Sequence, residues 1–202
     1  MIRPRGGLRP APGVRHNGRM ADETNEGRRL LLRGLPAFAL GMALGPRAAL
    51  ASPRDERRLS FLHTHTGARL EVAFGADGHY LPEGLSRVED FLKDHLTGER
   101  HAIDPRLLDL LHDLRLLTGA RDPFAVISGY RSPRTNAMLH ARSGGVANGS
   151  LHMRGQAIDI RLADVRTVVL RDAALELRRG GVGFYPGSDF VHVDTGRVRS
   201  WS

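Results

Sequence analysis

Two short segments of the chain carry the side chains best suited to chemistry. His152 and Asp159 are seven residues apart, and Gly155 between them permits a sharp bend that would return both side chains to one point. His192 and Asp194 are two residues apart, so a strand there would place both on one face. If the two segments meet, His152, Asp159 and His192 can bind one metal ion.

This set of side chains is typical of a catalytic zinc site. Two histidines and one aspartate supply three ligands, and a catalytic zinc ion keeps its fourth position for water. The ion lowers the pKa of that water and polarises a carbonyl, which is what amide hydrolysis requires. A nearby carboxylate must then accept the proton of the water, and Asp189 and Asp194 are the candidates.

The spacing alone leaves a structural alternative open. A histidine in a strand is more often packed or hydrogen-bonded than bound to a metal, and the His-Glu-x-x-His helix of many metalloproteases is absent from the sequence. A second pair, His63 and His65, lies in a polar stretch over 52–66 that is interpreted as a mobile segment. Histidines in such a segment are more often solvated than metal ligands.

The elements predicted around these residues are a mixture of helices and strands. Asp104 and Pro105 are a typical helix start, and Gly119 is a typical helix end. Asp164 is predicted to cap the last helix. The mixture favours an α+β domain over 52–202, with a small mixed or antiparallel sheet flanked by helices. The predicted strands span 69–74, 79–81, 123–128, 155–162, 182–185 and 190–194, and the predicted helices span 85–96, 105–118, 134–142 and 164–178.

Residues 1–51 have the composition of a disordered extension followed by an export signal. Residues 1–19 are rich in Arg, Gly and Pro, and Met20 is an alternative start. Arg28 and Arg29 precede a short apolar run over 34–44, and Ala49-Leu50-Ala51 resembles a cleavage site. The paired arginines resemble a twin-arginine signal, with an ordinary secretory signal or an uncleaved anchor as alternatives. The run is too short for a stable membrane anchor.

Most of the basic charge belongs to this leader. The net charge is +8, but nine of the 30 basic and three of the 22 acidic residues lie in 1–51, which leaves 21 against 19, or +2, for 52–202. A nucleic-acid partner is therefore not expected. The chain has no Cys, which excludes disulfides, thiolate ligands and a Cys nucleophile. The length suits one globular domain, and a monomer is expected.

The segments that carry the chemistry are part of a longer ordered pattern. It resembles the M15 peptidase group, and within that group the murein endopeptidase K type, also known as the domain-of-unknown-function 882 family. The resemblance covers about residues 59–202. Its main motifs are Ser150-x-His152-x-x-Gly155-x-Ala157-x-Asp159, Phe190-Val191-His192-Val193-Asp194, Ser128-Gly129-Tyr130-Arg131-Ser132-Pro133 and Gly180-Gly181-Val182-Gly183.

The resemblance implies roles for individual residues. It implies an M15 (hedgehog/DD-peptidase-like) architecture in which Zn²⁺ is held by His152, Asp159 and His192. It also implies that Arg131 binds substrate, since a guanidinium can hold a carboxylate or carbonyl; the alternative is an ion pair at a helix start. Many M15 relatives carry an acid where Asp189 stands, and the closer subgroup shares the position of Asp194. The base is predicted to be Asp189 or Asp194, and Asp194 is the alternative that could instead orient a ligand.

The implied function is that of an exported zinc metallopeptidase. It would hydrolyse peptide cross-links or stem peptides of peptidoglycan in the periplasm or cell wall, with peptidoglycan peptides as its partners. The alternatives are a DD- or LD-carboxypeptidase of the same family, or a non-catalytic zinc-containing module that binds the cell wall.

Overall fold

The computed structural model describes residues 55–143 and 147–202. The predicted extension, twin-arginine signal and cleavage site in residues 1–51 lie outside the described residues. Within the described ranges, no helix is long and apolar enough to cross a membrane.

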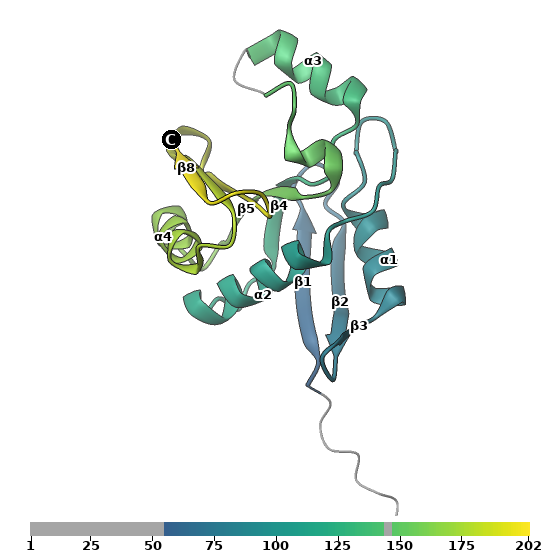
Figure 1. Ribbon diagram of the computed structural model, residues 1–202, viewed down its shortest axis with the longest axis vertical. Helices are drawn as coiled ribbons and strands as arrows, with labels where there is room; N and C mark the ends of the chain where they lie inside the picture. Colours follow the sequence, from purple (N-terminus) through teal and green to yellow (C-terminus); the bar gives the residue numbers. More distant parts are fainter. Residues whose placement is uncertain (1–54, 144–146) are drawn as a thin grey trace, which may run out of the picture. The chain divides into compact units, whose positions relative to one another are not determined.

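The described chain contains eight strands and four α-helices (Figure 1). The strands are β1 (Arg57–His63), β2 (Arg69–Ala76), β3 (His79–Tyr80), β4 (Phe124–Ser128), β5 (Ala157–Arg161), β6 (Gly181–Tyr185), β7 (Phe190–Asp194) and β8 (Arg199–Trp201). The helices are α1 (Pro82–Phe91), α2 (Pro105–Thr118), α3 (Pro133–Ser143) and α4 (Thr167–Leu177). Two short 3₁₀ turns, η1 (Leu151–Arg154) and η2 (Pro186–Ser188), precede β5 and β7.

All eight strands belong to one mixed sheet with the order β3-β2-β1-β4-β5-β7-β6-β8. The β1–β4 and β6–β8 pairs are parallel, and the other neighbouring pairs are antiparallel. This arrangement confirms the predicted α+β class with a mixed sheet and flanking helices. The sheet is wider than predicted because β1 and β8 were not expected.

The prediction of a mobile segment over 52–66 is wrong for 57–63. Arg57–His63 is β1, which lies between β2 and β4 inside the sheet. Leu59, Phe61 and His63 are buried, while the residues between them are intermediate in exposure. The period-2 pattern of a strand is therefore present, but the polar residues on the other face lower the average apolar content of the segment.

Helix starts and ends follow the local side chains. The carboxylate of Asp104 accepts a hydrogen bond from the Arg106 N–H (3.0 Å), Pro105 begins α2, and Gly119 ends it in the left-handed region (φ +67°), as predicted. Asp164 does not cap α4. Its carboxylate instead accepts hydrogen bonds from the backbone N–H groups of 121 and 122, and α4 begins at Thr167.

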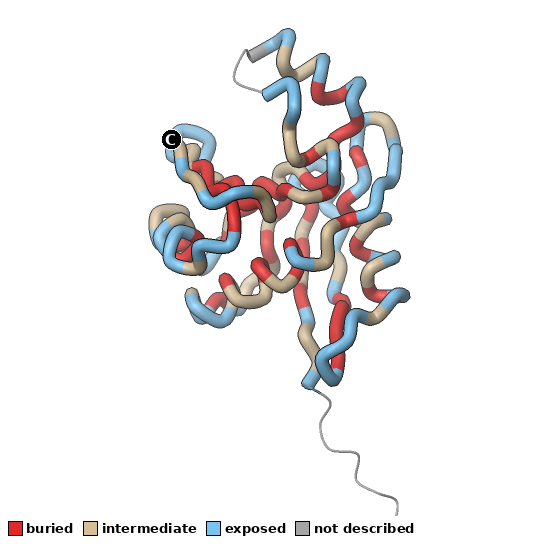
Figure 2. Tube along the Cα trace, in the orientation of Figure 1, coloured by how far each residue is buried: buried red, intermediate tan, exposed pale blue. Residues whose placement is uncertain are grey.

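The C-terminal half of the sheet has one apolar face and one polar face. Cross-strand partners share a face, and Ile158, Ile160, Val191 and Val193 pair with one another on the face that joins the core. Helix α4 packs against β6 and β7, and also against α2. Figure 2 shows that buried residues concentrate along the strands. The residues between these apolar positions, including 159 and 192, point to the opposite face.

Candidate metal centre

Three elements bring His152, Asp159 and His192 together. Asp159 on β5 and His192 on β7 are direct cross-strand partners. His152 comes from η1, which ends at Gly155 in the left-handed region (φ +63°) and leads into β5. The predicted bend at Gly155 is confirmed, and only glycine fits there, because a Cβ would also collide with the carbonyl oxygen of Ala102.

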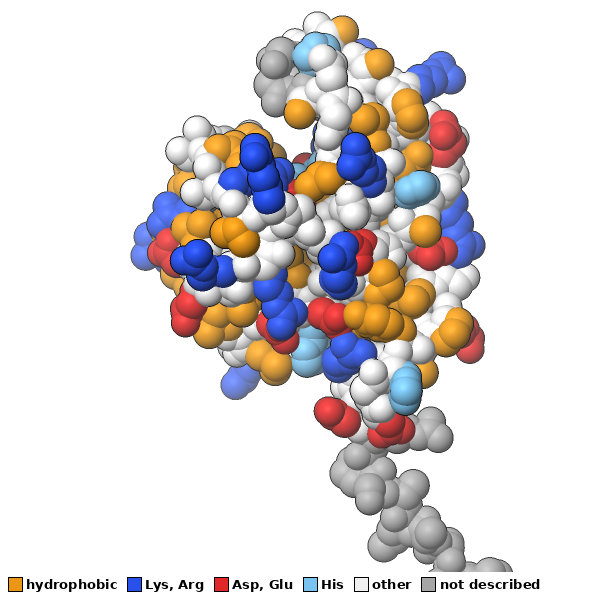
Figure 3. Space-filling view, in the orientation of Figure 1, with side chains coloured by type: hydrophobic (Ala, Val, Ile, Leu, Met, Phe, Trp, Pro, Cys, Tyr) orange, Lys and Arg blue, Asp and Glu red, His pale blue; other side chains and the backbone are white. Residues whose placement is uncertain are grey.

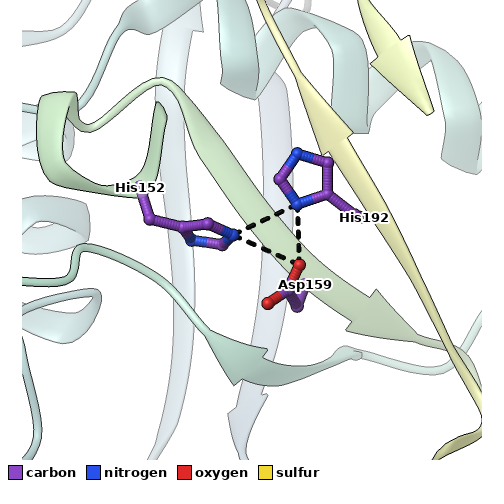
Figure 4. A group of neighbouring side chains, drawn as sticks. All are labelled: His152, Asp159 and His192. Carbon is purple, nitrogen blue, oxygen red and sulfur yellow. Dashed lines mark hydrogen bonds and ion pairs between the residues drawn. The ribbon is translucent and has the colours of Figure 1, made fainter. Parts of the chain in front are cut away.

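The three side chains point at one another (Figure 4). The Oδ1 of Asp159 lies 2.8 Å from Nδ1 of His192 and 3.2 Å from Nε2 of His152. The two ring nitrogens are 3.1 Å apart. All three residues are buried, and among the described residues they form the one group of three or more His, Cys, Asp or Glu side chains with ligand atoms this close.

The outer nitrogen of each ring has its own hydrogen-bond partner. Nδ1 of His152 donates to the carbonyl oxygen of Gly129 (2.8 Å), and Nε2 of His192 donates to Oδ2 of Asp194 (3.1 Å). Because a carbonyl or carboxylate oxygen only accepts, the inner nitrogens are left to present lone pairs. Two lone pairs beside a carboxylate repel unless a cation lies among them. The side chains therefore fit a metal ion with nitrogen and oxygen ligands.

The electrostatics of the cluster agree with this fit. Burial would raise the pKa of Asp159, but the two histidines hold it well below its usual range. Burial opposes a charge on His192, yet hydrogen bonds to Asp159 and Asp194 outweigh it and raise the pKa of His192. The cluster thus favours a positive charge between Asp159 and the two histidines. A proton on His192 and a metal ion would compete for this position.

Asp194 lies behind His192 and does not face the open side of the cluster. It has no exposed surface, and its carboxylate accepts hydrogen bonds from the N–H groups of Gly181 (2.9 Å) and Gly196 (2.8 Å). The guanidinium of Arg199 donates to both oxygens, at 3.2 and 2.7 Å. These contacts hold the carboxylate against His192 and leave little capacity for a proton from substrate water.

Asp189, the other predicted acid, does not lie with the cluster. It ends η2 in the left-handed region (φ +51°), with its side chain 65% exposed. Its carboxylate accepts a hydrogen bond from the Thr167 hydroxyl and lies 3.8 Å from Arg161. The turn η2 lies just before Asp189, and the carboxylate pairs with α4 and β5 and not with the cluster.

Arg131 lies beside the cluster. Its Nη2 is 3.5 Å from Oδ2 of Asp159 and 3.2 Å from the Ser128 hydroxyl. Burial lowers the pKa of Arg131, and the carboxylates of Asp159 and Asp94 oppose that shift. The Nε group is buried without a hydrogen-bond partner among the described residues. A buried guanidinium with an unused donor is suited to an anionic or carbonyl ligand.

The cluster forms part of the wall of a cavity of about 510 Å³, a volume typical of a ligand site. Figure 3 shows a hollow between the α3 end of the molecule and the C-terminal strands. The sequence-based predictions missed the aromatic wall of this cavity. The period-2 alternation along β6 and β7 would have placed two of its members on the face of His192. Besides the cluster, the cavity is lined by Arg131, Tyr185, Ser188, Phe190, Arg199 and Trp201, among others.

Across the described residues, fold and site together define an α+β protein with a buried His-Asp-His cluster suited to a metal ion beside an open cavity. Comparison with known proteins then identifies the family: the family model described as peptidoglycan L,D-endopeptidase MepK matches residues 51–201. The chain belongs to this family, which confirms the resemblance to the murein endopeptidase K type.

Two relatives show how far the similarity extends. The chain is 43% identical over 183 residues to the peptidoglycan L,D-endopeptidase MepK of Escherichia coli (strain K12), covering 89% of this chain and 100% of the relative. It is 40% identical over 170 residues to the probable peptidoglycan L,D-endopeptidase MepK of Haemophilus influenzae, covering 83% of this chain and 91% of the relative.

Proposed function

We propose that this chain is a zinc-dependent peptidoglycan L,D-endopeptidase that acts in the periplasm or cell wall. Its family makes it a peptidoglycan endopeptidase, a hydrolase of peptide bonds, and the names of its relatives supply the L,D specificity. The observation that carries the proposal is the buried cluster of His152, Asp159 and His192 at the wall of the cavity.

Zinc is the metal that best suits these ligands. Two imidazoles and one carboxylate are a common catalytic zinc set, and no thiolate is available in the chain. When bound there, the ion supplies a Lewis acid for the scissile carbonyl and an activated water. The M15 (hedgehog/DD-peptidase-like) architecture is part of the same proposal.

Arg131 is proposed to bind the substrate. Its guanidinium lines the cavity next to Asp159, and peptidoglycan peptides carry carboxylates and carbonyls that such a group can hold in one orientation. Because Arg131 is itself buried, it would lose little side-chain entropy on binding.

The two predicted acids are proposed to have different roles. Asp194 is fully buried and orients His192, as carboxylates behind metal-bound histidines do. Asp189 is exposed and stands between Ser188 and Phe190, which both line the cavity. Release from Thr167 would let its carboxylate turn toward that cavity and accept the proton of the attacking water.

The route of export is proposed from the leader alone. Arg28 and Arg29 with the following apolar run would direct export by the twin-arginine route, and the signal would be removed after Ala51. Fusion of residues 1–51 to a reporter, with and without an Arg28→Lys/Arg29→Lys change, tests this. Export that persists in the changed leader would exclude the twin-arginine route.

The activity is tested on purified sacculi and on soluble muropeptide dimers joined by either an L,D or a D,D bond. Zinc-loaded protein is expected to cleave the L,D-linked dimer into monomers, as seen by mass spectrometry, and a chelator or His152→Ala should abolish this. Release of a single terminal residue would favour the carboxypeptidase alternative. Binding to sacculi without any product would favour the wall-binding module.

A further inference from the structure

Gly183 on β6 makes room for a large side chain beside the metal cluster. On β6, Gly183 is the cross-strand partner of His192, and on its other side it pairs with Trp201 of β8. A Cβ on Gly183 would lie 2.6 Å from Cε2 of Trp201, so the indole occupies the space that a side chain would fill. The rings of Trp201 and His192 are consequently 5.2 Å apart between centroids.

Tyr185 lies on this same face and touches the indole. It is two residues beyond Gly183 on β6, and its ring stacks on its cross-strand partner Phe190, with centroids 4.5 Å apart. Nε1 of Trp201 is 2.8 Å from the Tyr185 hydroxyl oxygen. The hydroxyl is therefore fixed from two sides, by ring packing and by a hydrogen bond.

The direction of that hydrogen bond leaves the proton of Tyr185 unused. An indole N–H can only donate, so the tyrosine oxygen is the acceptor and keeps its own O–H for another partner. No acceptor for this O–H is found among the described residues. Tyr185 is half-buried and lines the cavity together with Arg131 and His192, where a bound peptide would lie.

We propose that the Tyr185 hydroxyl donates a hydrogen bond to the carbonyl oxygen of the scissile peptide bond, and that Trp201 is the residue that positions this hydroxyl. The inference rests on the proposed endopeptidase function, to which it adds a catalytic residue. The Tyr185 ring could pack against Phe190 without its hydroxyl. The O–H group is needed as a hydrogen-bond donor only in the reaction.

The donor acts on charge that develops during the reaction. When the water oxygen bonds to the carbonyl carbon, the π electrons of the carbonyl move to its oxygen, and the water proton passes to the base. The C–N bond then breaks, the carbonyl re-forms, and the proton goes to the leaving amine. Tyr185 keeps its proton throughout, and a donor placed in advance at the oxygen stabilises the charge of the tetrahedral state.

The test compares Tyr185→Phe with the wild-type enzyme on the soluble L,D-linked dimer. The substitution keeps the ring and removes the donor, so kcat should fall by about 100-fold or more, as for other donors to a developing oxyanion, with KM nearly unchanged. Zinc content and melting temperature should match the wild type. Tyr80→Phe is the matched control, because the Tyr80 hydroxyl bonds to Asp109 on α2 and should leave kcat unchanged.

Trp201→Phe supplies a second variant with a readout specific to positioning. Loss of the indole N–H should lower kcat in the wild-type background but cause little further loss in the Tyr185→Phe background, because the two residues act through one hydroxyl. Additive losses would exclude this relation and overturn the role of Trp201.

The outcomes separate this inference from the proposed function. A zinc-loaded wild-type enzyme that cleaves no muropeptide overturns both. A wild-type enzyme that is active, with Tyr185→Phe within twofold of its kcat, overturns the role of Tyr185 alone. A raised KM at unchanged kcat overturns it too, since the hydroxyl would then stabilise the bound substrate and the transition state equally and contribute nothing specific to the oxyanion.

Discussion

His192 shows how much of this site depends on a single side chain. One ring nitrogen faces Asp159 and His152, and the other is held by Asp194, whose carboxylate is in turn held by Arg199. A histidine fixed in this way presents one tautomer to the metal and loses little freedom on binding. Folding therefore orders the His192 side chain before a metal ion binds to it.

Asp194→Asn is expected to weaken zinc binding. An amide cannot replace both the acceptor for His192 and the partner of Arg199, so zinc affinity should fall by about 10–100-fold. Competition with a chromophoric chelator measures this. Zinc affinity equal to that of the wild type would show that the carboxylate does not orient His192.

Asp189→Asn is expected to impair catalysis and to leave zinc binding intact. Zinc affinity should stay at the wild-type value because Asp189 does not contact the cluster, while kcat should fall by about 10²–10⁴-fold if it is the general base. Steady-state kinetics on the L,D-linked dimer give the answer. A variant with unchanged kcat would remove Asp189 from the mechanism and leave the base to another group.

At the scale of elements, strands and helices with clear local signals were predictable. The Asp104-Pro105 start and the Gly119 end of α2 are set by side chains next to one another in sequence, and so is the bend at Gly155. Alternation along 190–194 also predicted that His192 and Asp194 share a face, whereas the pairing of Asp159 with His192 across the sheet is visible only in the structure. The predicted features depend on a few neighbouring residues.

The features that escaped prediction depend on distant partners. β8 has only three residues and is a strand because it pairs with β6. The carboxylate of Asp189 turns to Thr167, 22 residues away, which no spacing rule predicts. The helix predicted over 85–96 ends at Phe91, because the Asp94 carboxylate accepts the N–H of Leu96 and competes with the helical pattern.

Asp94 also ties the turn after α1 to the loop that bears Arg131. Its carboxylate accepts the N–H of Ser132 (2.9 Å) and of Leu96 (2.9 Å). Burial would raise the pKa of Asp94, but hydrogen bonds from Thr135, Ser132 and Leu96 outweigh it and hold the pKa well below its usual range. The contribution of Asp94 to stability is therefore present above the unfolded pKa of about 4 and is lost as pH falls below it.

Asp94→Asn should accordingly destabilise the protein in a pH-dependent way. Urea unfolding at pH 7 should show a loss of about 1–3 kcal/mol, and the difference from the wild type should shrink below about pH 4, where the Asp94 carboxyl of the unfolded wild-type chain begins to be protonated. Glu83→Gln, an exposed acid at the start of α1, is the control and should show no such trend. If Asp94→Asn destabilises the protein equally at pH 7 and below about pH 4, the charge of Asp94 does not contribute to stability.

At the scale of the whole molecule, the two faces of the sheet have different roles: one stabilises the fold and the other carries the functional site. In the C-terminal half, one face carries the apolar core under α4, and the other carries the metal cluster and the aromatic wall of the cavity. Binding of a ligand to the folded state alone adds stability, so the metal should act on the whole fold through β5 and β7.

Removal of the metal should lower the melting temperature. With zinc at about 100 times its dissociation constant, binding adds about 2.7 kcal/mol, which for a domain of this size corresponds to roughly 5–10 °C. Calorimetry with and without a chelator measures the shift. His152→Ala should melt at one temperature under both conditions, and a chelator shift that survives in that variant would place the metal elsewhere.

The short edge strand β8 should separate from the sheet before the rest of the protein unfolds. Three residues pair it to β6, yet Arg199 holds the partner of His192 and Trp201 holds Tyr185. Fraying at a sheet edge costs far less free energy than global unfolding. Mild denaturant should therefore extinguish activity while the core strands still resist hydrogen exchange, so that inactivation and unfolding become two separate events.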